Sequence, residues 1–305
     1  MIDNSWYILI MSCTAIILTA LGGPRDIGDV GHFMAAFLGR PAPEQVVTAI
    51  MERYKRIGGR SPLPEIVKAQ ADALGKVLGG GFRVYEGFAY LRPLINEAVL
   101  RAASEDADRI IGLSMSPFET AVTSGVYKAA FESAESRIPK LFIPSWHDNP
   151  LFINAWVEKI QSAKQKFGDD AKTAWIFTSH SIPKRYIEAG DPYLSQIQQT
   201  VFLIAETAGI KHWRIAWQSK GARAIEPWLE PEVEPTMDRL KADGFEAVIE
   251  VPVGFTCDHM ETLYDIDIVH RAYAERIGLR FGRVESLNTS GAFIAALADI
   301  IKRHT

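Results

Sequence analysis

Acidic side chains gather in the sequence directly after an expected buried strand. Residues 246–253 form a short β-branched run that is typical of such a strand, and residues 254–267 follow it. In the second segment, Asp258, Glu261 and Asp265 stand at positions i, i+3 and i+7. On an α-helix these positions share one face and spread over roughly 10 Å. Three carboxylates at the carboxyl end of a strand favour a path or site for a hard or borderline cation.

The alternative interpretation of this segment is a solvated acidic helix face. Such a face usually includes lysines, and there is none between Val251 and Val269, so we favour the cation site. Thr256 or Asp258 is the expected helix N-cap. On this helix His259 lies about 100° away from the carboxylate face, and we expect it to play a supporting role at most.

A histidine occupies a similar position elsewhere in the chain. Residues 174–178 read as a strand, and Ser179-His180-Ser181-Ile182-Pro183 follows at its end. Open α/β sheets bind ligands at the carboxyl ends of their strands, and imidazole handles protons and metals near neutral pH. A single histidine is often only structural, so a structural and a functional interpretation of His180 remain equally open from the residues alone.

Composition limits the class of protein. A chain of 305 residues that is 48% hydrophobic can bury a large core, and we expect two domains. A net charge of −4 and a pI near 6.0 give no indication of a nucleic-acid partner. The two cysteines, Cys13 and Cys257, form no CxxC or cluster spacing. We therefore expect no disulfide framework, structural zinc site or iron–sulfur cluster, and a reducing cytoplasm fits.

The N-terminal residues 6–21 are almost entirely apolar and resemble a signal anchor. They lack a basic flank, because Asp3 is the only charged residue before them, and they run directly into a glycine turn. We therefore interpret residues 15–21 as the first buried parallel strand and expect no integral membrane segment. Met11 is a possible natural start.

Strands and helices are expected to alternate along the whole chain. The expected strands are 15–21, 82–87, 109–115, 140–145, 174–178, 213–218, 246–253 and 281–284. The expected helices are 27–38, 43–54, 64–78, 93–105, 123–135, 149–167, 193–208, 234–242, 267–277 and 291–302. This alternation predicts an α/β protein with two parallel sheets, each flanked by helices on both faces. We place the domains at 12–145 and 146–290, with residues 291–304 packing back on the first domain and a cleft between the two.

The motifs of this sequence resemble those of the ferrochelatase family. Val251-Pro-Val-Gly-Phe-Thr-Cys-Asp-His-Met-Glu-Thr-Leu-Tyr264 is similar to the family signature, and Thr178-Ser-His-Ser-Ile-Pro183 is similar to its catalytic-histidine motif. The resemblance runs through nearly the whole chain and includes Leu21-Gly-Gly-Pro24, Tyr54-Lys-Arg-Ile-Gly-Gly-Arg-Ser-Pro62, Gly190-Asp-Pro-Tyr193, Ala216-Trp-Gln-Ser-Lys220, Pro227-Trp-Leu229 and Glu285-Ser-Leu-Asn288. It implies two Rossmann-like domains of the chelatase fold and insertion of ferrous iron into a porphyrin in heme biosynthesis.

The resemblance also implies roles for particular residues. His180 matches the catalytic histidine and Glu261 the glutamate paired with it, and both would meet the metal. The chemistry needs both types, because a porphyrin loses two pyrrole protons while imidazole and carboxylate accept protons or ligate Fe²⁺. Asp258 and Asp265 would extend the metal path. Asp265 stands where many relatives have glutamate, which keeps the charge and shortens the reach.

A flat porphyrin edged with carboxylates needs aromatic walls and polar contacts at its rim. The candidate walls are Trp228, Tyr90 and Phe255, of which Phe255 is the best candidate for a core residue. The candidate rim contacts are Arg53, Tyr54, Ser61, Gln70 and Tyr127. All of these except Tyr54 match positions that hold the propionates of coproporphyrin III in the Gram-positive type of the family. We therefore expect coproporphyrin III and Fe²⁺ as substrates, no other cofactor, and a monomer.

Other functions remain open at this point. Leu21 stands where the Gram-positive type has a tyrosine, and the loop 116–120 lacks a histidine found in many relatives, so protoporphyrin IX is the alternative substrate. A porphyrin or metal carrier without turnover is a second alternative, although a carrier would not need both His180 and Glu261. A chelatase for cobalt or nickel is a third, because affinity alone ranks those metals above iron.

Overall fold

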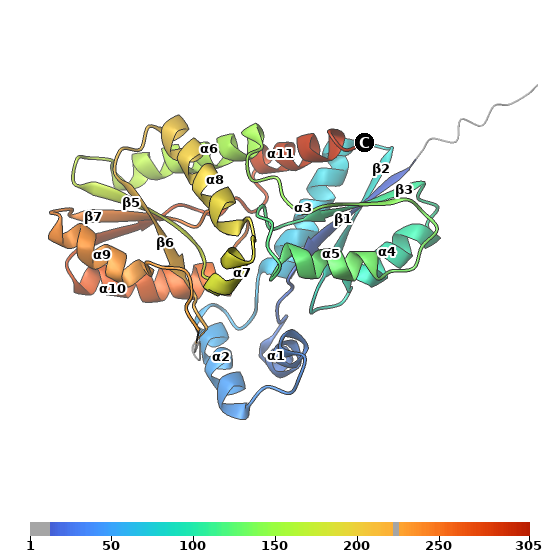
Figure 1. Cartoon of the computed structure of the whole chain (residues 1–305), viewed down its shortest axis with the longest axis horizontal. Helices are drawn as coiled ribbons and strands as arrows, with labels where there is room; N and C mark the ends of the chain where they lie inside the picture. The colour runs from blue at the N-terminus through green and yellow to red at the C-terminus, as the bar shows by residue number, and fades with distance from the viewer. Residues whose placement is uncertain (1–12, 222–225) are drawn as a thin grey trace, which may run out of the picture.

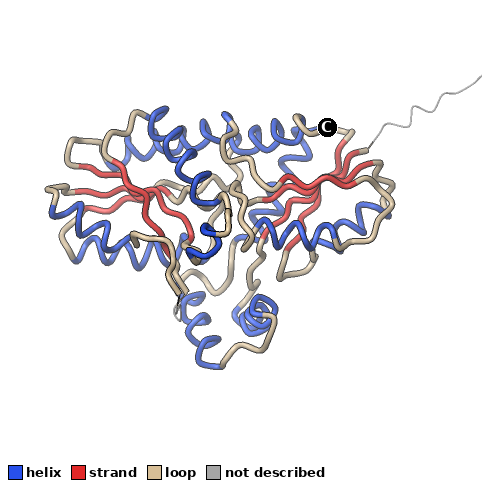
Figure 2. The backbone as a smooth tube through the Cα atoms, viewed as in Figure 1, coloured by secondary structure: helices blue, strands red, loops and turns tan. Residues whose placement is uncertain are grey.

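A computed structural model of the chain describes residues 13–221 and 226–305. Within these residues, the strands form two separate parallel sheets of four strands each, in the orders β2-β1-β3-β4 and β6-β5-β7-β8 (Figures 1 and 2). The first sheet contains β1 (Thr14–Ala20), β2 (Phe82–Phe88), β3 (Arg109–Ser114) and β4 (Lys140–Ile143). The second contains β5 (Thr173–His180), β6 (Trp213–Gln218), β7 (Ala247–Val251) and β8 (Arg280–Arg283). The prediction of two parallel sheets flanked by helices is confirmed.

Helices connect the strands and cover both sheets. The α-helices are α1 (Val30–Leu38), α2 (Glu44–Arg56), α3 (Leu63–Leu78), α4 (Ile95–Ser104), α5 (Ser124–Glu132), α6 (Pro150–Phe167), α7 (Lys184–Glu188), α8 (Tyr193–Ala208), α9 (Val233–Ala242), α10 (Arg271–Arg276) and α11 (Gly291–Lys302). A short 3-10 turn, η1 (Ile27–Asp29), precedes α1, and a π-helix, η2 (Glu261–His270), precedes α10. The sequence patterns did not predict α7, and they predicted a helix of ordinary α geometry where η2 lies.

Strand β1 shows why the N-terminal apolar run belongs to the core. It lies between β2 and β3, and every residue from Ala15 to Ala20 is buried. A strand that is covered on both faces needs a continuous apolar sequence, which this segment provides. The expected strand at 15–21 is confirmed within one residue at either end, whereas residues 6–12 lie outside the described part of the chain. No helix among the described residues is both long enough and apolar enough to cross a bilayer.

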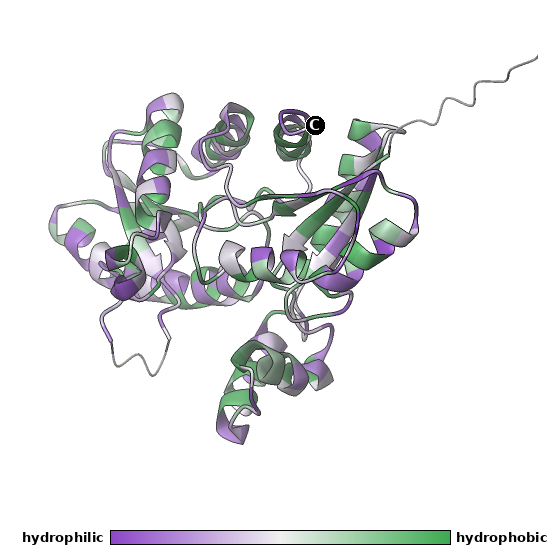
Figure 3. Ribbon diagram, turned by 45° about the vertical axis from the view of Figure 1, so that its right-hand side comes forward, coloured by the Kyte–Doolittle hydropathy of each residue, from purple (hydrophilic) through white to green (hydrophobic). Residues whose placement is uncertain are grey.

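A single apolar core joins the two halves of the molecule. It includes Leu18 on β1 and Val67 on α3 from the first half, and Trp156 on α6 and Phe177 on β5 from the second. Helix α11 lies along α6 and also packs on α3 (Figures 1 and 3). The C-terminal helix therefore contacts both halves, while the domain boundary at 145/146 stays a prediction.

The carboxyl ends of the two sheets face each other. Thr256, which follows β7, donates a hydrogen bond from Oγ1 to the carbonyl of Met115, which follows β3, at 3.0 Å. In both sheets the strand order reverses at this edge, between β1 and β3 and between β5 and β7. Ligands of open α/β sheets bind at such points of reversal. The fold therefore directs attention to the residues that follow β5 and β7.

Candidate active site

His180 is the last residue of β5, and its ring is held in one orientation. The ring Nδ1 lies 2.6 Å from the carbonyl oxygen of Ser181, which can only accept a hydrogen bond. Nδ1 therefore donates to this oxygen, and Nε2 is the ring nitrogen left to accept a proton or to ligate a metal. The hydroxyl of Tyr193 donates to the carbonyl of His180 at 2.9 Å and lies 2.6 Å from Oγ of Ser179. These contacts fix the strand end that carries the histidine.

Glu261 is the first residue of η2 and is linked to His180 through one side chain. Gln218, at the end of β6, pairs with His180 in the register of the two strands. Its amide Nε2 donates to the carbonyl of Glu261 at 3.1 Å. The family motifs identify His180 and Glu261 as a catalytic pair. Both are neighbours of Gln218, although they are 261 − 180 = 81 positions apart in the sequence.

The prediction that three carboxylates share one helix face is wrong. The helix begins at Glu261, after Asp258, and Met260 precedes it without a side-chain cap, so neither expected N-cap residue forms the cap. The segment from Glu261 to His270 has the i→i+5 hydrogen bonding of a π-helix, whose wider turn invalidates a count based on 3.6 residues. Only Glu261 and Asp265 belong to this helix.

Asp258 is occupied by other contacts. Its Oδ1 accepts hydrogen bonds from Arg283 Nη1 at 3.1 Å and from Ser286 Oγ at 2.7 Å, and its Oδ2 accepts from Asn288 Nδ2 at 2.9 Å. Burial alone would raise the pKa of this carboxyl, but the Arg283 charge and these donors outweigh burial and lower the pKa. With donors on both oxygens, Asp258 supports the local structure, and its assignment as a metal ligand stays a prediction.

Asp265 keeps a position from which it could pass on a cation. Ser219 Oγ donates to its Oδ2 at 2.5 Å, and Arg53 Nη1 lies 4.0 Å from its Oδ1. Burial raises the pKa of Asp265, and the charge of nearby Glu261 adds to the effect. Among the described residues, no group of three or more His, Cys, Asp or Glu side chains is arranged to hold a metal ion. The acidic path therefore stays a prediction, and Glu261 and Asp265 are its members on η2.

His259 contacts Glu261 directly, which the sequence reasoning missed. Its Nε2 lies 3.2 Å from Glu261 Oε2, and its Nδ1 lies 3.1 Å from the carbonyl of Cys257. Because that carbonyl only accepts, Nδ1 donates to it, and Nε2 is the ring nitrogen that lies next to the carboxylate. The Phe255 ring packs against the imidazole, with ring centres 4.6 Å apart. His259 and Glu261 are thus close neighbours in the candidate site.

The N-terminal half contributes tyrosines to this site. Burial raises the pKa of Tyr54 on α2, and the charge of Glu261 raises it further. Burial also raises the pKa of Tyr127 on α5, with further contributions from Tyr90, Cys257 and Glu261. Both hydroxyls therefore remain protonated, and both lie close enough to Glu261 for its charge to affect them. Helices α2 and α5 thus lie near the residues that follow β7.

Four of the five predicted rim residues are buried, namely Tyr54, Ser61, Gln70 and Tyr127. Gln70 has no exposed surface, and its amide donates to the carbonyl of Asn288 at 2.7 Å. It cannot touch a ligand in this conformation, which corrects its assignment as a porphyrin contact. Ser61 is also buried, because it packs under the turn at Gly23, where an added Cβ would lie only 2.6 Å from the serine side chain.

The remaining predicted contacts are partly accessible. Arg53 is 41% exposed at its side chain and stacks on the ring of Tyr264 at 5.3 Å. Trp228 is half-buried and forms an isolated β-bridge with Pro183, just after the histidine motif. Tyr90 is half-buried and contacts Phe37 edge to face.

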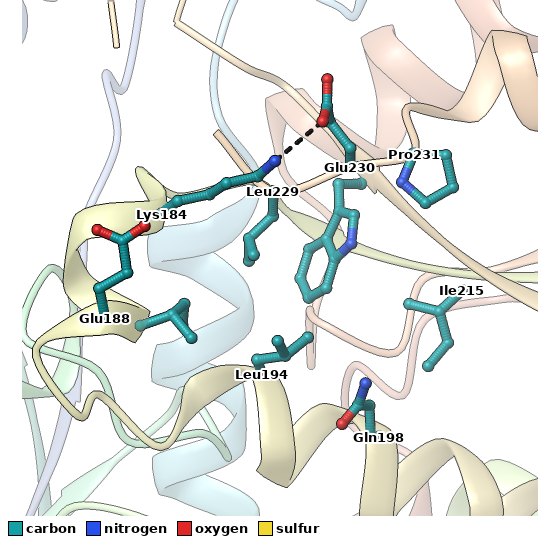
Figure 4. A pocket seen from close by; sticks show the side chains of 10 residues that line it. Lys184, Glu188, Leu194, Gln198, Ile215, Leu229, Glu230 and Pro231 are labelled. Atoms are coloured by element: carbon teal, nitrogen blue, oxygen red, sulfur yellow. Dashed lines mark hydrogen bonds and ion pairs between the residues drawn. The ribbon is translucent and has the colours of Figure 1, made fainter. Parts of the chain in front are cut away.

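Two open pockets lie away from these residues. One of about 480 Å³ lies among α7, α8, β6 and residues 229–231, with Trp217 and Leu229 in its wall and an ion pair between Lys184 and Glu230 at its mouth (Figure 4). The second, of about 330 Å³, lies between residues 119–128 and residues 186–192. Neither is lined by a residue of the predicted site, so the chemistry is assigned from the contacts above and not from these cavities.

Solved structures of chelatases share this fold. CbiX, the terminal enzyme for biosynthesis of siroheme in denitrifying bacteria, matches with a TM-score of 0.58 at 13% identity, covering 96% of this chain and 99% of that chain. The sirohydrochlorin chelatase SirB from Bacillus subtilis subspecies spizizenii matches with a TM-score of 0.54 at 8% identity, covering 95% of this chain and 94% of that chain. At these identities the likeness concerns the fold alone, and it agrees with the two-domain chelatase fold.

Sequence comparison gives the family. A protein related to this chain over 311 residues, the ferrochelatase of Geotalea daltonii, is 33% identical, covering 95% of this chain and 97% of that protein. The coproporphyrin III ferrochelatase of a Geobacillus species is 35% identical over 298 residues, covering 94% of this chain and 96% of that protein. The ferrochelatase family model matches residues 13–305. The chain therefore belongs to the ferrochelatase family.

Proposed function

We propose that this enzyme inserts Fe²⁺ into coproporphyrin III, with His180 and Glu261 as its catalytic residues. The observation that supports this assignment best is the geometry of the pair. Hydrogen bonding leaves the Nε2 lone pair of His180 free, and Gln218 links the two residues. One imidazole at the end of β5 and one carboxylate at the start of η2 suit a reaction in which a metal and two protons exchange places.

The proton balance follows from these groups. Each turnover releases two pyrrole protons as Fe²⁺ binds the four ring nitrogens, so the site needs two acceptors. The Nε2 of His180 can ligate the metal or accept the first proton. Glu261 can accept the second, and the His259 imidazole, whose Nε2 lies 3.2 Å from Glu261 Oε2, offers a route for that proton away from the porphyrin. Both acceptors recover by losing the protons to water.

The iron path is expected to run through Asp265. Replacing Asp265 with asparagine should raise the apparent KM for Fe²⁺ more than the KM for porphyrin, because the amide keeps the shape and removes the charge that attracts the cation. Initial rates at varied Fe²⁺ and at varied porphyrin separate the two constants. A change confined to the porphyrin KM would mean that this part of η2 only shapes the cleft.

The preference for coproporphyrin III rests on the polar groups near the site. Coproporphyrin III carries four propionates and protoporphyrin IX carries two, so the first substrate needs more cationic and hydroxyl partners. Arg53 is partly exposed and lies 4.0 Å from Asp265 on η2, whereas Tyr54 and Tyr127 are buried near the charge of Glu261. The apolar Leu21 at the end of β1 favours the alternative substrate, protoporphyrin IX, whose vinyl groups are apolar.

Replacing Arg53 with alanine should weaken turnover of coproporphyrin III about tenfold or more and affect protoporphyrin IX less. A charge-assisted contact with a propionate is worth roughly 1.5–3 kcal/mol when partly desolvated, and each 1.4 kcal/mol is about a factor of ten. The measurement is kcat/KM for both porphyrins in the same detergent, with Fe²⁺ under anaerobic conditions.

Lys55→Ala is the matched control for Arg53→Ala. Lys55 is a cation on the same turn of α2 that pairs with Glu52 at 2.6 Å, and its loss should leave both rates unchanged. Equal losses on both porphyrins in Arg53→Ala, or faster turnover of protoporphyrin IX by the wild type, would favour protoporphyrin IX as the substrate.

We further infer a monomeric, cytoplasmic enzyme that needs no cofactor besides its Fe²⁺ substrate. The two cysteines are too few for an iron–sulfur cluster held by this chain. Burial raises the pKa of the Cys257 thiol to about 12, so this side chain stays a neutral thiol.

A further inference from the structure

The π-helix η2 needs support from outside its own backbone. A π-helix is rarer than an α-helix and usually lasts a single turn, whereas η2 extends from Glu261 to His270. Two neighbouring strands lie beside it, and one residue of each meets it. Glu250 on β7 and Arg283 on β8 are paired in the register of the second sheet, and both make charged contacts with η2 or the segment before it.

Arg283 holds two carboxylates that lie on either side of Glu261 in the sequence. Its Nη1 contacts Oδ1 of Asp258 at 3.1 Å, three positions before Glu261. Its Nε and Nη2 contact the two oxygens of Asp267 at 2.8 and 3.0 Å, six positions after Glu261. The side chain of Arg283 is only 12% exposed, so these contacts are little screened by water. One guanidinium thus fixes both flanks of the catalytic glutamate.

Glu250 holds the far end of η2. Its two oxygens each lie 3.1 Å from Nδ1 of His270, the last residue of the π-helix, and the glutamate has no exposed surface. Burial alone would lower the pKa of His270, but the charge of Glu250 and its hydrogen bond outweigh burial and raise the pKa. Glu234 on α9 and Asp265 on η2 also favour the protonated imidazole. The pair is therefore an ion pair inside the protein.

We propose that Glu250 and Arg283 act together as positioning residues that hold η2 in its π register and so fix the place of the Glu261 carboxylate. A return to α geometry would close each turn with one residue fewer and would rotate Asp267 and His270 relative to Glu261. Arg283 could then not keep its hydrogen bonds to both Asp258 and Asp267 while Glu250 keeps its contact with His270. The proposal rests on the proposed catalytic role of Glu261, because the clamp acts through that residue.

The first test removes the buried ion pair without leaving a buried charge. In the double variant Glu250→Leu with His270→Leu, apolar side chains of similar volume replace both partners, a change that is often neutral or stabilising. We expect kcat for Fe²⁺ insertion to fall about tenfold or more, with the porphyrin KM and the Tm unchanged, because small misplacements of a catalytic group are costly. Wild-type kcat in this variant would overturn the proposal.

The second test weakens the other half of the clamp. In Arg283→Lys, a single ammonium can hold one of the two aspartates well but cannot reproduce the guanidinium fork, so kcat should again fall about tenfold. Arg280→Lys is the matched control on the same strand, because Arg280 is exposed and lies only near Asp170, at 3.6 Å, and this change should leave kcat unaltered. Full kcat in Arg283→Lys would also contradict the clamp.

A double-mutant cycle separates a positioning role from a general structural one. Combined with Glu261→Gln, each clamp variant should cost little further activity, because the clamp has lost the group that it positions. Additive losses would mean that the clamp supports the fold and not Glu261. If the wild type inserted no iron, or if Glu261→Gln kept the wild-type rate, the proposed function would fail first. An active wild type, an impaired Glu261→Gln and fully active clamp variants would reject the clamp alone.

Discussion

Replacing His180 with alanine should abolish iron insertion while the protein still folds and binds porphyrin. The imidazole supplies the Nε2 lone pair. Strand β5 carries no other histidine that could replace it. Loss of a positioned proton acceptor typically costs about a hundredfold to ten-thousandfold in rate, and here the same group is also expected to ligate the metal. The fold should survive, because the partly exposed ring makes a single hydrogen bond to its own chain segment.

Anaerobic initial rates, fluorescence titration with porphyrin and circular dichroism measure the three properties separately. His147→Ala is the matched control. His147 is also partly buried and contacts Ser145 at 2.9 Å and Gln199 at 3.1 Å, away from the residues that follow β5 and β7. It should keep the wild-type rate. Substantial turnover in His180→Ala would remove this histidine from the mechanism.

Replacing Glu261 with glutamine should lower the insertion rate by about a hundredfold or more. The amide has nearly the shape of the carboxylate, but it can neither accept a proton nor balance the charge of Fe²⁺. It would also replace the carboxylate that lies 3.2 Å from Nε2 of His259. The comparison is made on single-turnover rates with both substrates saturating, so that binding does not contribute.

Two further variants calibrate the Glu261 result. Glu261→Asp keeps the charge and shortens the side chain by one methylene, so its rate should fall between those of the wild type and Glu261→Gln. Glu230→Gln removes a carboxylate that pairs with Lys184 at 3.0 Å on the surface, and its rate should equal that of the wild type. A Glu261→Gln enzyme with undiminished single-turnover rate would show that another group takes the second proton.

The order of strands and helices could be predicted because the signals were local. The β-branched and apolar runs predicted the eight strands of the described residues close to their observed bounds. Strand β1 has a nearly continuous apolar sequence and is buried from Ala15 to Ala20. Helix α7 was missed because its five residues, Lys184–Glu188, are too few to display an apolar period. The sequence patterns also could not predict that η2 is a π-helix. Its π geometry is accompanied by contacts with Glu250 on β7 and Arg283 on β8, which are remote in sequence.

Sequence motifs could predict which residues belong to the candidate site. They could not predict contacts between segments that are remote in sequence and meet only through packing. The motifs pointed to His180 and Glu261, and in the structure both residues are neighbours of Gln218. His259 was discounted because it was counted on an α-helix that does not begin until later in the chain. The only signal that could have found it is its place two residues before Glu261. Asp258 and Gln70 were assigned to substrates because their partners, Arg283 and Asn288, are remote in sequence.

The core that spans both sheets also governs how this molecule can form. Helix α11 follows every strand in the sequence, yet it packs on α3 beside the first sheet as well as on α6 beside the second. During synthesis the first sheet therefore keeps apolar surface uncovered until α11 has been made, even though all of its strands emerged much earlier. The two halves are therefore expected to complete their folding together at the end of translation.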